Sequence, residues 1–484
     1  MARWVVGVLL LVAGSAMAVP VQILATGDMH SVLKGRMMDG YLLGGPAAMF
    51  GYWKAREGYA PNKFLVLSTG DNVSGQAGFT MLEGEPDIEV MNAMGFQASA
   101  INTHEFDFGR GQLLRMAAAA KFPLLAANLH GPDGQVAEVA KPYVLIDTQG
   151  VKVGVVGLIT RAATQPNLGL YTIGEYDPAL RAAVAEARAK GAQVIVVIAS
   201  LSDAELAALA RATADLHLPL MFAGGTHEYT QQFVPESGTW VMSNGAYWAG
   251  YGRIDLDVDL ADGSARVEAI KQVRLQQRTP ALDPALQEIV ARWQQKLGPD
   301  YNKPLGTAAG SLLRVTSATA FTLHCWLVAN PAATFAMINT NGIRQDLPAG
   351  PITRADIINA LPFDDKLYRI KMTGKQLLEF KGMKNDTVSV NDLATVDGKV
   401  MNLQSNLPLD PATTYAVILC DYLYNTSDYL RACDPAPVTV SPDWRLPLYQ
   451  WLADHPTTAQ KPLEKTAAMT RVSYIGASGY KGTP

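Results

Sequence analysis

Near-continuous runs of aliphatic residues limit the possible fold of this chain more than any other feature. Residues 151–159 read VKVGVVGLI and residues 192–200 read AQVIVVIAS. Strands of this composition are typically buried on both faces, as in the parallel sheets of α/β proteins. Residues 178–191, between the two runs, have the pattern of a helix. Strands that alternate with helices predict an α/β fold.

Further predicted strands end in residues that can bind a metal ion. These strands are VQILATGD (21–28), KFLVLSTGD (63–71) and LPLMFAGGTH (218–227). They end at Asp28, Asp71 and His227, while His30 completes an Asp-x-His pair and His104 follows another apolar stretch. Carboxylate and imidazole suit a divalent ion such as Zn, Mn or Fe. Because α/β sheets build sites at the carboxyl ends of their strands, we expect these side chains to converge.

The length of 484 residues predicts two large domains. Residues 282–298 have the pattern of a helix capped by an aspartate, and a second α/β unit follows it. We therefore expect a first domain over residues 19–278, a linker helix over 279–300 and a second domain over 301–475. The formal net charge of −4 provides no basic surface for a nucleic-acid polymer.

The first residues, MARWVVGVLLLVAGSAMAVP, have the composition of a secretory signal peptide. Arg3 precedes a short apolar run, and the small residues AMA predict cleavage after Ala18. We expect a periplasmic or secreted protein with no membrane span after signal cleavage. A retained N-terminal anchor is the alternative.

The three cysteines leave two possibilities open. Cys420 and Cys433 flank one local segment and could form a disulfide in an exported protein, leaving Cys325 free. Alternatively, all three are free thiols.

Several motifs extend over nearly the whole mature chain in a characteristic order. In the first half they are ILATGDMH, LVLSTGDNVSG, EVMNAMGF, NTHEFDFG and AANL. In the second half they are INTNGIRQDLPAGPIT, ALPFDDKLYRIKMTGKQLLE and YAVILCDYLYNTSDY. With these motifs the chain resembles the 5'-nucleotidase family of the calcineurin-like metallophosphoesterases. The resemblance implies a four-layer α/β metallophosphoesterase sandwich domain and a C-terminal α/β 5'-nucleotidase substrate-binding domain.

The resemblance also implies a metal centre that is only half present. The positions that match the family's first metal site are Asp28, His30, Asp71 and His227. Three positions that match its second metal site are occupied by Thr103, Ser200 and Gly225. Only the shared Asp71 then remains of the second ligand set, so we expect one divalent ion (Zn, Mn or Fe).

Three residues that lie near those positions in the sequence are candidates to replace the missing ligands. Asn102, Asp203 and His217 lie close to those positions in sequence, but none stands at a matching position. In an extended segment Asn102 would point to the opposite face from Thr103. Loss of the second site is therefore favoured over its replacement.

The remaining matched positions imply a catalytic pair and a separate substrate pocket. His104 matches the family's catalytic histidine and Asp107 its orienting partner. The positions that match the substrate pocket are Arg314, Asn339, Arg344, Phe363, Tyr422 and Asp428. Phe363 and Tyr422 would sandwich an aromatic base. The sequences NTNGIR and NTSDY replace glycines of the family motifs, which makes the ligand of this pocket an open question.

We expect an exported, metal-dependent hydrolase of a small nucleotide or other phosphoester, with an impaired metal site and low nucleotidase activity. The retained His104–Asp107 pair favours catalysis. Two alternatives remain: an inactive ligand-binding protein on the same scaffold, favoured by the missing ligands, and a hydrolase of another ester, resembling the thiosulfohydrolases.

Overall fold

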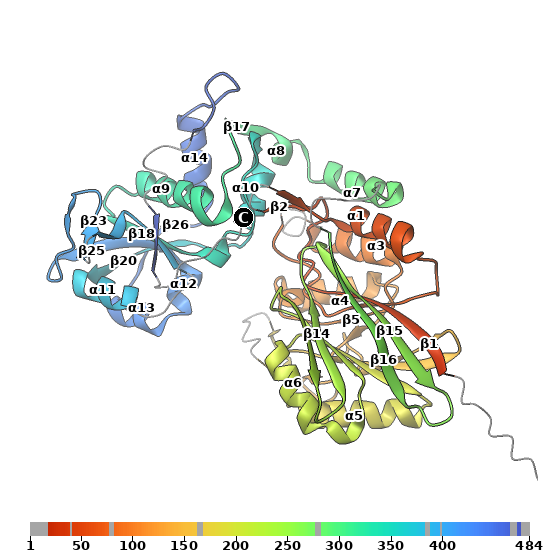
Figure 1. The fold of residues 1–484 in the computed structure, drawn as a ribbon. Helices are drawn as coiled ribbons and strands as arrows, with labels where there is room; N and C mark the ends of the chain where they lie inside the picture. Colours follow the sequence, from red (N-terminus) through yellow and green to blue (C-terminus); the bar gives the residue numbers. More distant parts are fainter. Residues whose placement is uncertain are drawn as a thin grey trace, which may run out of the picture.

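Two six-stranded sheets form the centre of the first domain in the computed structural model (Figure 1). The structure describes residues 18–38, 41–76, 82–161, 168–275, 282–382, 388–396, 399–464 and 472–475. The first sheet has the order β16 (Ala265–Arg274), β15 (Gly250–Asp259), β1 (Ala18–Thr26), β4 (Leu65–Ser68), β5 (Ala98–Ala100) and β6 (Leu124–Leu125). Strands β1, β4, β5 and β6 are parallel, and β15 pairs with β1 in the antiparallel direction.

The second sheet is built in a similar way. Its order is β13 (Tyr229–Val234), β14 (Thr239–Asn244), β12 (Leu220–Ala223), β11 (Val194–Ala199), β9 (Val151–Leu158) and β8 (Tyr143–Thr148). Strands β9, β11, β12 and β14 are parallel, with an antiparallel strand at each edge. Both sheets therefore direct the carboxyl ends of their central strands to one edge, as the sequence predicts.

Burial on both faces explains the aliphatic runs. Val194 and Val196 of β11 pack between the two sheets, whereas Ile195 and Val197 pack against outer helices. Successive side chains of a strand point to opposite faces, so both sets must be apolar. Helices α1 (Pro46–Tyr52), α3 (Glu85–Met94) and α4 (Gly109–Ala119) cover the first sheet, and α5 (Tyr176–Ala189) and α6 (Asp203–Ala212) cover the second. The predicted four-layer sandwich is confirmed.

Helix α7 (Pro284–Lys296) leads from the first domain to the second (Figure 1). The Asp283 carboxylate accepts the Leu286 backbone N–H at 3.0 Å, which is the predicted N-cap. Asp283 also pairs with Lys54 at 2.7 Å, and the Trp293 indole N–H donates to Glu89 of α3 at 2.6 Å. The linker helix is therefore attached to the first domain. The short helix α8 (Pro299–Asn302) and strand β17 (Pro304–Ala308) follow it.

The second domain contains a third six-stranded sheet. Its order is β26 (Val438–Ser441), β20 (Leu367–Thr373), β25 (Thr414–Cys420), β18 (Phe335–Asn339), β21 (Val388–Asn391) and β27 (Val472–Ile475). The larger helices around it are α9 (Thr319–Ala329), α10 (Arg354–Ala360), α11 (Gly374–Gly382) and α14 (Leu446–Asp454). Two short helices, α12 (Asp421–Asn425) and α13 (Asp428–Cys433), follow β25. Phe321, Trp326 and Phe335 are fully buried in its core.

Of the two possibilities for the cysteines, the structure has the second: all three are free thiols. Cys420 ends β25, where its buried thiol donates to the Asn339 side-chain oxygen at 3.4 Å. Cys433 ends α13 and is hydrogen-bonded to Tyr429. Closeness in sequence does not bring these thiols together, because each one faces a different partner.

The predicted signal peptide covers residues 1–18, and residues 1–17 lie outside the described residues. That prediction is therefore left untested. Within the described ranges, every helix is too short or too polar to cross a membrane.

Two glycines allow close packing around Thr69: Gly27 within the first sheet and Gly224 between the two sheets. Gly27 follows β1 and Gly224 follows β12, and both lie against Thr69, which follows β4. A Cβ atom at Gly224 would lie 2.5 Å from the Thr69 hydroxyl oxygen and 2.8 Å from its Cβ. A larger residue at Gly224 would force the strand ends apart.

We expect Gly224→Ala to lower the free energy of unfolding by about 1–3 kcal/mol, the usual effect of overpacking a buried position. Urea denaturation followed by tryptophan fluorescence measures it. Gly310→Ala is the matched control, because a Cβ there meets no atom within 4 Å. Equal stability of both variants would contradict the close contact.

Candidate metal and active site

Three potential metal ligands converge where the two sheets meet. Asp28 and His30 follow β1 of the first sheet, and His227 follows β12 of the second. One ligand atom of each residue lies within 4.8 Å of the others. The Nε2 atoms of His30 and His227 face each other at 2.9 Å. Two imidazole nitrogens and a carboxylate directed at one point form a donor set that fits a divalent ion.

Asp71 is the fourth predicted ligand and follows β4. Burial and the nearby charge of Asp71 raise the pKa of Asp28 well above its usual value. Burial likewise raises the pKa of Asp71. Two buried carboxylates that disfavour each other's charge are stabilised when a cation lies beside them. The electrostatics therefore agree with the geometry for one ion.

All four predicted ligands have a left-handed backbone. The φ angles are 52° for Asp28, 50° for His30, 48° for Asp71 and 63° for His227. Non-glycine residues in this region are strained, and such strain collects at functional sites because the surroundings enforce it. In this chain the turns after the strands bring Asp28, His30 and His227 to one point, whereas Asp71 is not in that group of three and accepts the His104 backbone N–H at 3.0 Å.

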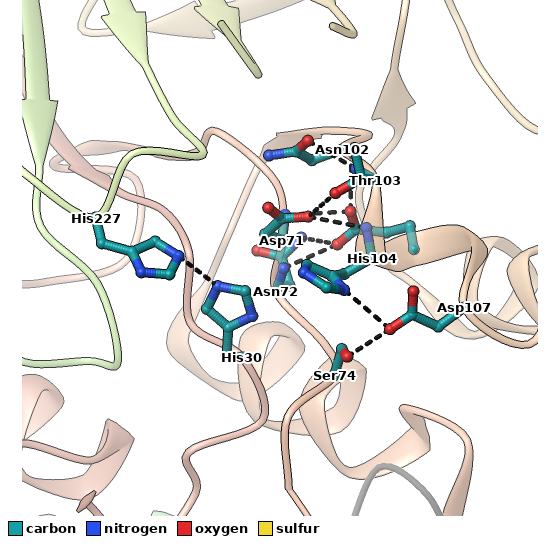
Figure 2. A network of polar contacts seen from close by, with 10 residues as sticks. His30, Asp71, Asn72, Ser74, Asn102, Thr103, His104, Asp107 and His227 are labelled. Carbon is teal, nitrogen blue, oxygen red and sulfur yellow. Dashed lines mark hydrogen bonds and ion pairs between the residues drawn. The ribbon is translucent and has the colours of Figure 1, made fainter. Parts of the chain in front are cut away.

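The catalytic pair predicted from sequence is assembled. The Nδ1 atom of His104 lies 2.9 Å from an Asp107 carboxylate oxygen, which also accepts the Ser74 hydroxyl at 2.5 Å (Figure 2). Burial alone would lower the pKa of His104, but the charges of Asp107 and Asp71 outweigh it and raise the pKa to about 9. A protonated imidazole beside the ligand cluster can donate a proton to an oxygen.

The three positions of the missing second site offer little to a metal ion. The Thr103 hydroxyl lies 3.5 Å from Asp71, and Ser200 is buried at the end of β11. Gly225 has no side chain, and its backbone N–H donates to both oxygens of Asp28, at 2.8 and 3.0 Å. These residues do not fit a second ion.

The expectation that Asn102 points away from this region is wrong. Strand β5 ends at Ala100, so Asn102 does not follow the alternation of an extended segment. Its buried side-chain nitrogen lies 3.5 Å from the place of a Cβ atom at Gly225. The amide oxygen accepts the Thr103 backbone N–H at 2.7 Å, which fixes the orientation of the amide. Asn102 therefore presents an NH₂ group, which has no lone pair for a metal.

The other two replacement candidates lie elsewhere. The Asp203 carboxylate accepts hydrogen bonds from the hydroxyls of Thr230 and Ser243. His217 precedes β12, so it lies at the opposite end of that strand from Gly225. Neither belongs to the ligand cluster.

Glu105 is a site residue that the sequence prediction missed. Its fully buried carboxylate accepts the backbone N–H groups of Asp71 at 3.1 Å, Asn72 at 2.8 Å and Asn102 at 2.9 Å. Burial and the charge of Asp71 raise the pKa of Glu105 to about 7, while those N–H groups oppose the shift. The acidic residue between His104 and Asp107 was the only local signal, because two of its three backbone partners, Asp71 and Asn72, follow a different strand.

Two predicted pocket residues of the second domain reach the ligand cluster. Phe363 and Arg344 line one cavity with His30, His104 and Tyr247. The Phe363 ring stacks on the His104 ring with 6.4 Å between centroids, and the Arg344 guanidinium lies 5.0 Å from the Phe363 centroid. The cavity therefore combines side chains from both domains.

The other predicted pocket residues have different surroundings. Arg314 donates to the Ile343 carbonyl at 3.2 Å, and Asn339 accepts from Cys420. Asp428 has a fully exposed side chain that pairs with Arg431. Tyr422 is 55% exposed, and the ring contacts of Phe363 are with His104 and Trp444 instead. The predicted aromatic sandwich is not assembled here, and the binding roles of these residues stay predictions.

Comparisons with known proteins give matches to 5'-nucleotidases and related proteins. Residues 315–433 match the family model of the 5'-nucleotidase C-terminal domain. The chain is 27% identical to protein UshA of Yersinia enterocolitica over 79% of this chain and 81% of that protein. It is 25% identical to endonuclease YhcR of Bacillus subtilis, of which it spans about a third (32%).

Solved structures show the same fold. A 5'-nucleotidase precursor from Thermus thermophilus aligns with a TM-score of 0.75 at 21% identity, over 92% of this chain and 99% of that one. The sulfate thiohydrolase SoxB of Thermus thermophilus aligns with a TM-score of 0.69 at 16% identity, over 92% and 95%. The predicted fold of a metallophosphoesterase domain and a C-terminal domain is confirmed.

We expect Glu105→Gln to lower the free energy of unfolding by about 1–3 kcal/mol, because the amide turns one acceptor into a donor facing buried N–H groups. It should also weaken metal binding, since Glu105 holds the backbone of Asp71. Thermal unfolding and calorimetric titration with Zn²⁺ measure the two effects. Glu186→Gln, on the exposed face of α5, should change neither. Normal metal affinity in Glu105→Gln would contradict this role.

Proposed function

We propose that this chain is a member of the 5'-nucleotidase family of the calcineurin-like metallophosphoesterases and an exported hydrolase of small phosphoesters that uses one divalent ion. The observation that carries the proposal is the cluster of Asp28, His30 and His227 beside the His104–Asp107 pair. Metal-assisted hydrolysis requires a bound metal ion and a nearby proton donor, and this arrangement can provide both.

One ion rather than two is supported by the donor atoms. Asp28, His30, Asp71 and His227 would hold the ion, which polarises a phosphoryl oxygen and lowers the pKa of water when bound. The positions that match the second metal site are occupied by Thr103, Ser200 and Gly225, which offer two hydroxyl groups and no side chain at the glycine. The NH₂ group of Asn102 faces the same region and repels a cation.

Three residues of the chain provide proton donation, charge compensation and contact with the organic part of the substrate. His104 holds a proton on Nε2, where it can pass to the leaving oxygen, while Asp107 accepts from Nδ1 and fixes the orientation of the ring. Arg344 brings a permanent positive charge to the cavity and compensates part of the phosphate charge. Phe363 offers an aromatic face to the organic part of the substrate.

A nucleotide is the substrate class that we favour. Relatives named 5'-nucleotidase and UshA support it, and so does an aromatic face next to an arginine. The impaired metal site predicts low nucleotidase activity. The same missing ligands support a second candidate, a ligand-binding protein without catalysis.

We expect the protein loaded with Zn²⁺ or Mn²⁺ and then desalted to retain about one ion per chain, since one ligand set is complete. Elemental analysis measures this ratio, and hydrolysis of a panel of nucleoside monophosphates is assayed before and after chelation. Chelation should abolish activity.

Thr103→Asn combined with Ser200→His is the matched variant for the metal count. It adds two ligands beside Asp71 without changing the backbone at Gly225, so it should bind a second ion. Two tightly bound ions in the unchanged protein would contradict the one-ion proposal. One bound ion without hydrolysis of any phosphoester would favour the ligand-binding alternative.

We expect His104→Asn to lower kcat by about 10²–10⁴-fold, the usual contribution of a positioned proton donor. The ion count should not change, because His104 is outside the ligand cluster. His217→Asn is the control: its φ of 49° suits asparagine, and it lies at the far end of β12. Full activity of His104→Asn would contradict the proposed mechanism.

A further inference from the structure

Tyr247 contacts three of the predicted metal ligands: Asp28, His30 and His227. Its hydroxyl oxygen lies 2.7 Å from Nδ1 of His227, and its backbone N–H donates to the Asp28 carbonyl at 2.9 Å. Its ring centroid lies 5.4 Å from that of His30 and 5.0 Å from that of His227. The residue comes from GAYWAG, between β14 and β15, a segment that the sequence prediction did not select.

The two ring nitrogens of His227 have different neighbours, so one is placed to bind an ion and the other to carry the proton. Nε2 faces His30, on the side of the ligand cluster, whereas Nδ1 faces the Tyr247 hydroxyl. Nε2 must keep its lone pair to bind an ion, so the proton of the neutral ring belongs on Nδ1. The tyrosine oxygen is placed to accept that proton in a hydrogen bond.

The backbone of Tyr247 indicates that its position is enforced. Its φ of 63° is left-handed, and a bulky residue in that region is a genuine outlier. Such strain persists only when surrounding contacts over-determine the conformation. Here the backbone bond to Asp28 and the side-chain bond to His227 do so together.

We propose that Tyr247 is a positioning residue that holds His227 in the metal-binding tautomer and ring orientation, and so sets the affinity of the site for a divalent ion. The inference rests on the ion of the proposed function. Partners of a metal-binding histidine act in this way through its second nitrogen.

Tyr247→Phe tests the proposal because it keeps the ring and removes only the oxygen. We expect its affinity for Zn²⁺, measured by competition with a chromophoric chelator, to fall by about 10–100-fold. Tyr251→Phe is the matched control: Tyr251 is a buried tyrosine whose hydroxyl donates to Glu57 at 2.6 Å, away from the ligand cluster. This variant should bind Zn²⁺ like the unchanged protein.

A double-mutant cycle separates action through His227 from a general structural effect. In a His227→Ala background, Tyr247→Phe should cause no further loss of Zn²⁺ affinity. An equal loss in both backgrounds, or an equal loss in Tyr247→Phe and Tyr251→Phe, would overturn the proposal. Unchanged affinity in Tyr247→Phe would also overturn it.

A measurement on the unchanged protein covers the case in which Tyr247→Phe does not fold. In the Co²⁺-loaded protein, the Nδ1–H of His227 should give a paramagnetically shifted, slowly exchanging proton signal that His227→Ala lacks. Absence of a slowly exchanging signal would overturn the role of Tyr247 and would leave the proposed one-ion function standing. If the unchanged protein binds neither Zn²⁺ nor Co²⁺, the one-ion function fails and the inference falls with it.

Discussion

The buried carboxylate of Glu105 is the interaction on which the site depends. It accepts backbone N–H groups from the turn after β4 and from the segment after β5, so it ties two neighbouring strand ends together. The Asp71 carboxylate, held by this arrangement, accepts the His104 backbone N–H at 3.0 Å. One buried charge thus orders a metal ligand and the catalytic histidine with respect to each other. Its burial is tolerated because several donors satisfy its oxygens.

In the proposed function, the chemistry and the recognition of substrate come from different domains. The first domain supplies the ligand cluster and the His104–Asp107 pair, and the second reaches the same cavity with Arg344 and Phe363. Helix α7 is fastened to the first domain through Asp283 and Trp293. The chain therefore passes to the second domain through the segment that follows α7.

Local patterns predicted the strands and the order of the ligands, because burial on both faces and residues at strand ends are properties of short segments. Asn102 was misjudged because β5 ends earlier than an extended segment requires. The sequence left the Cys420–Cys433 pairing open because closeness in sequence does not determine where a thiol points, and the folded chain has free thiols. Glu105 and Tyr247 were missed for a different reason. Their partners Asn72 and Asp28 lie far away in sequence, and only the folded chain brings them together.

The origin of the ligands in two separate sheets has a consequence for the lifetime of the protein. His30 and His227 are 197 residues apart, so an ion held by both would act as a cross-link that closes a very long loop. Closing a loop in the unfolded chain carries an entropic penalty that grows with loop length, so such a link favours the folded state. Chains without the ion would open more often and meet proteases in that state. The supply of metal in the surrounding compartment would then control how much of the protein persists.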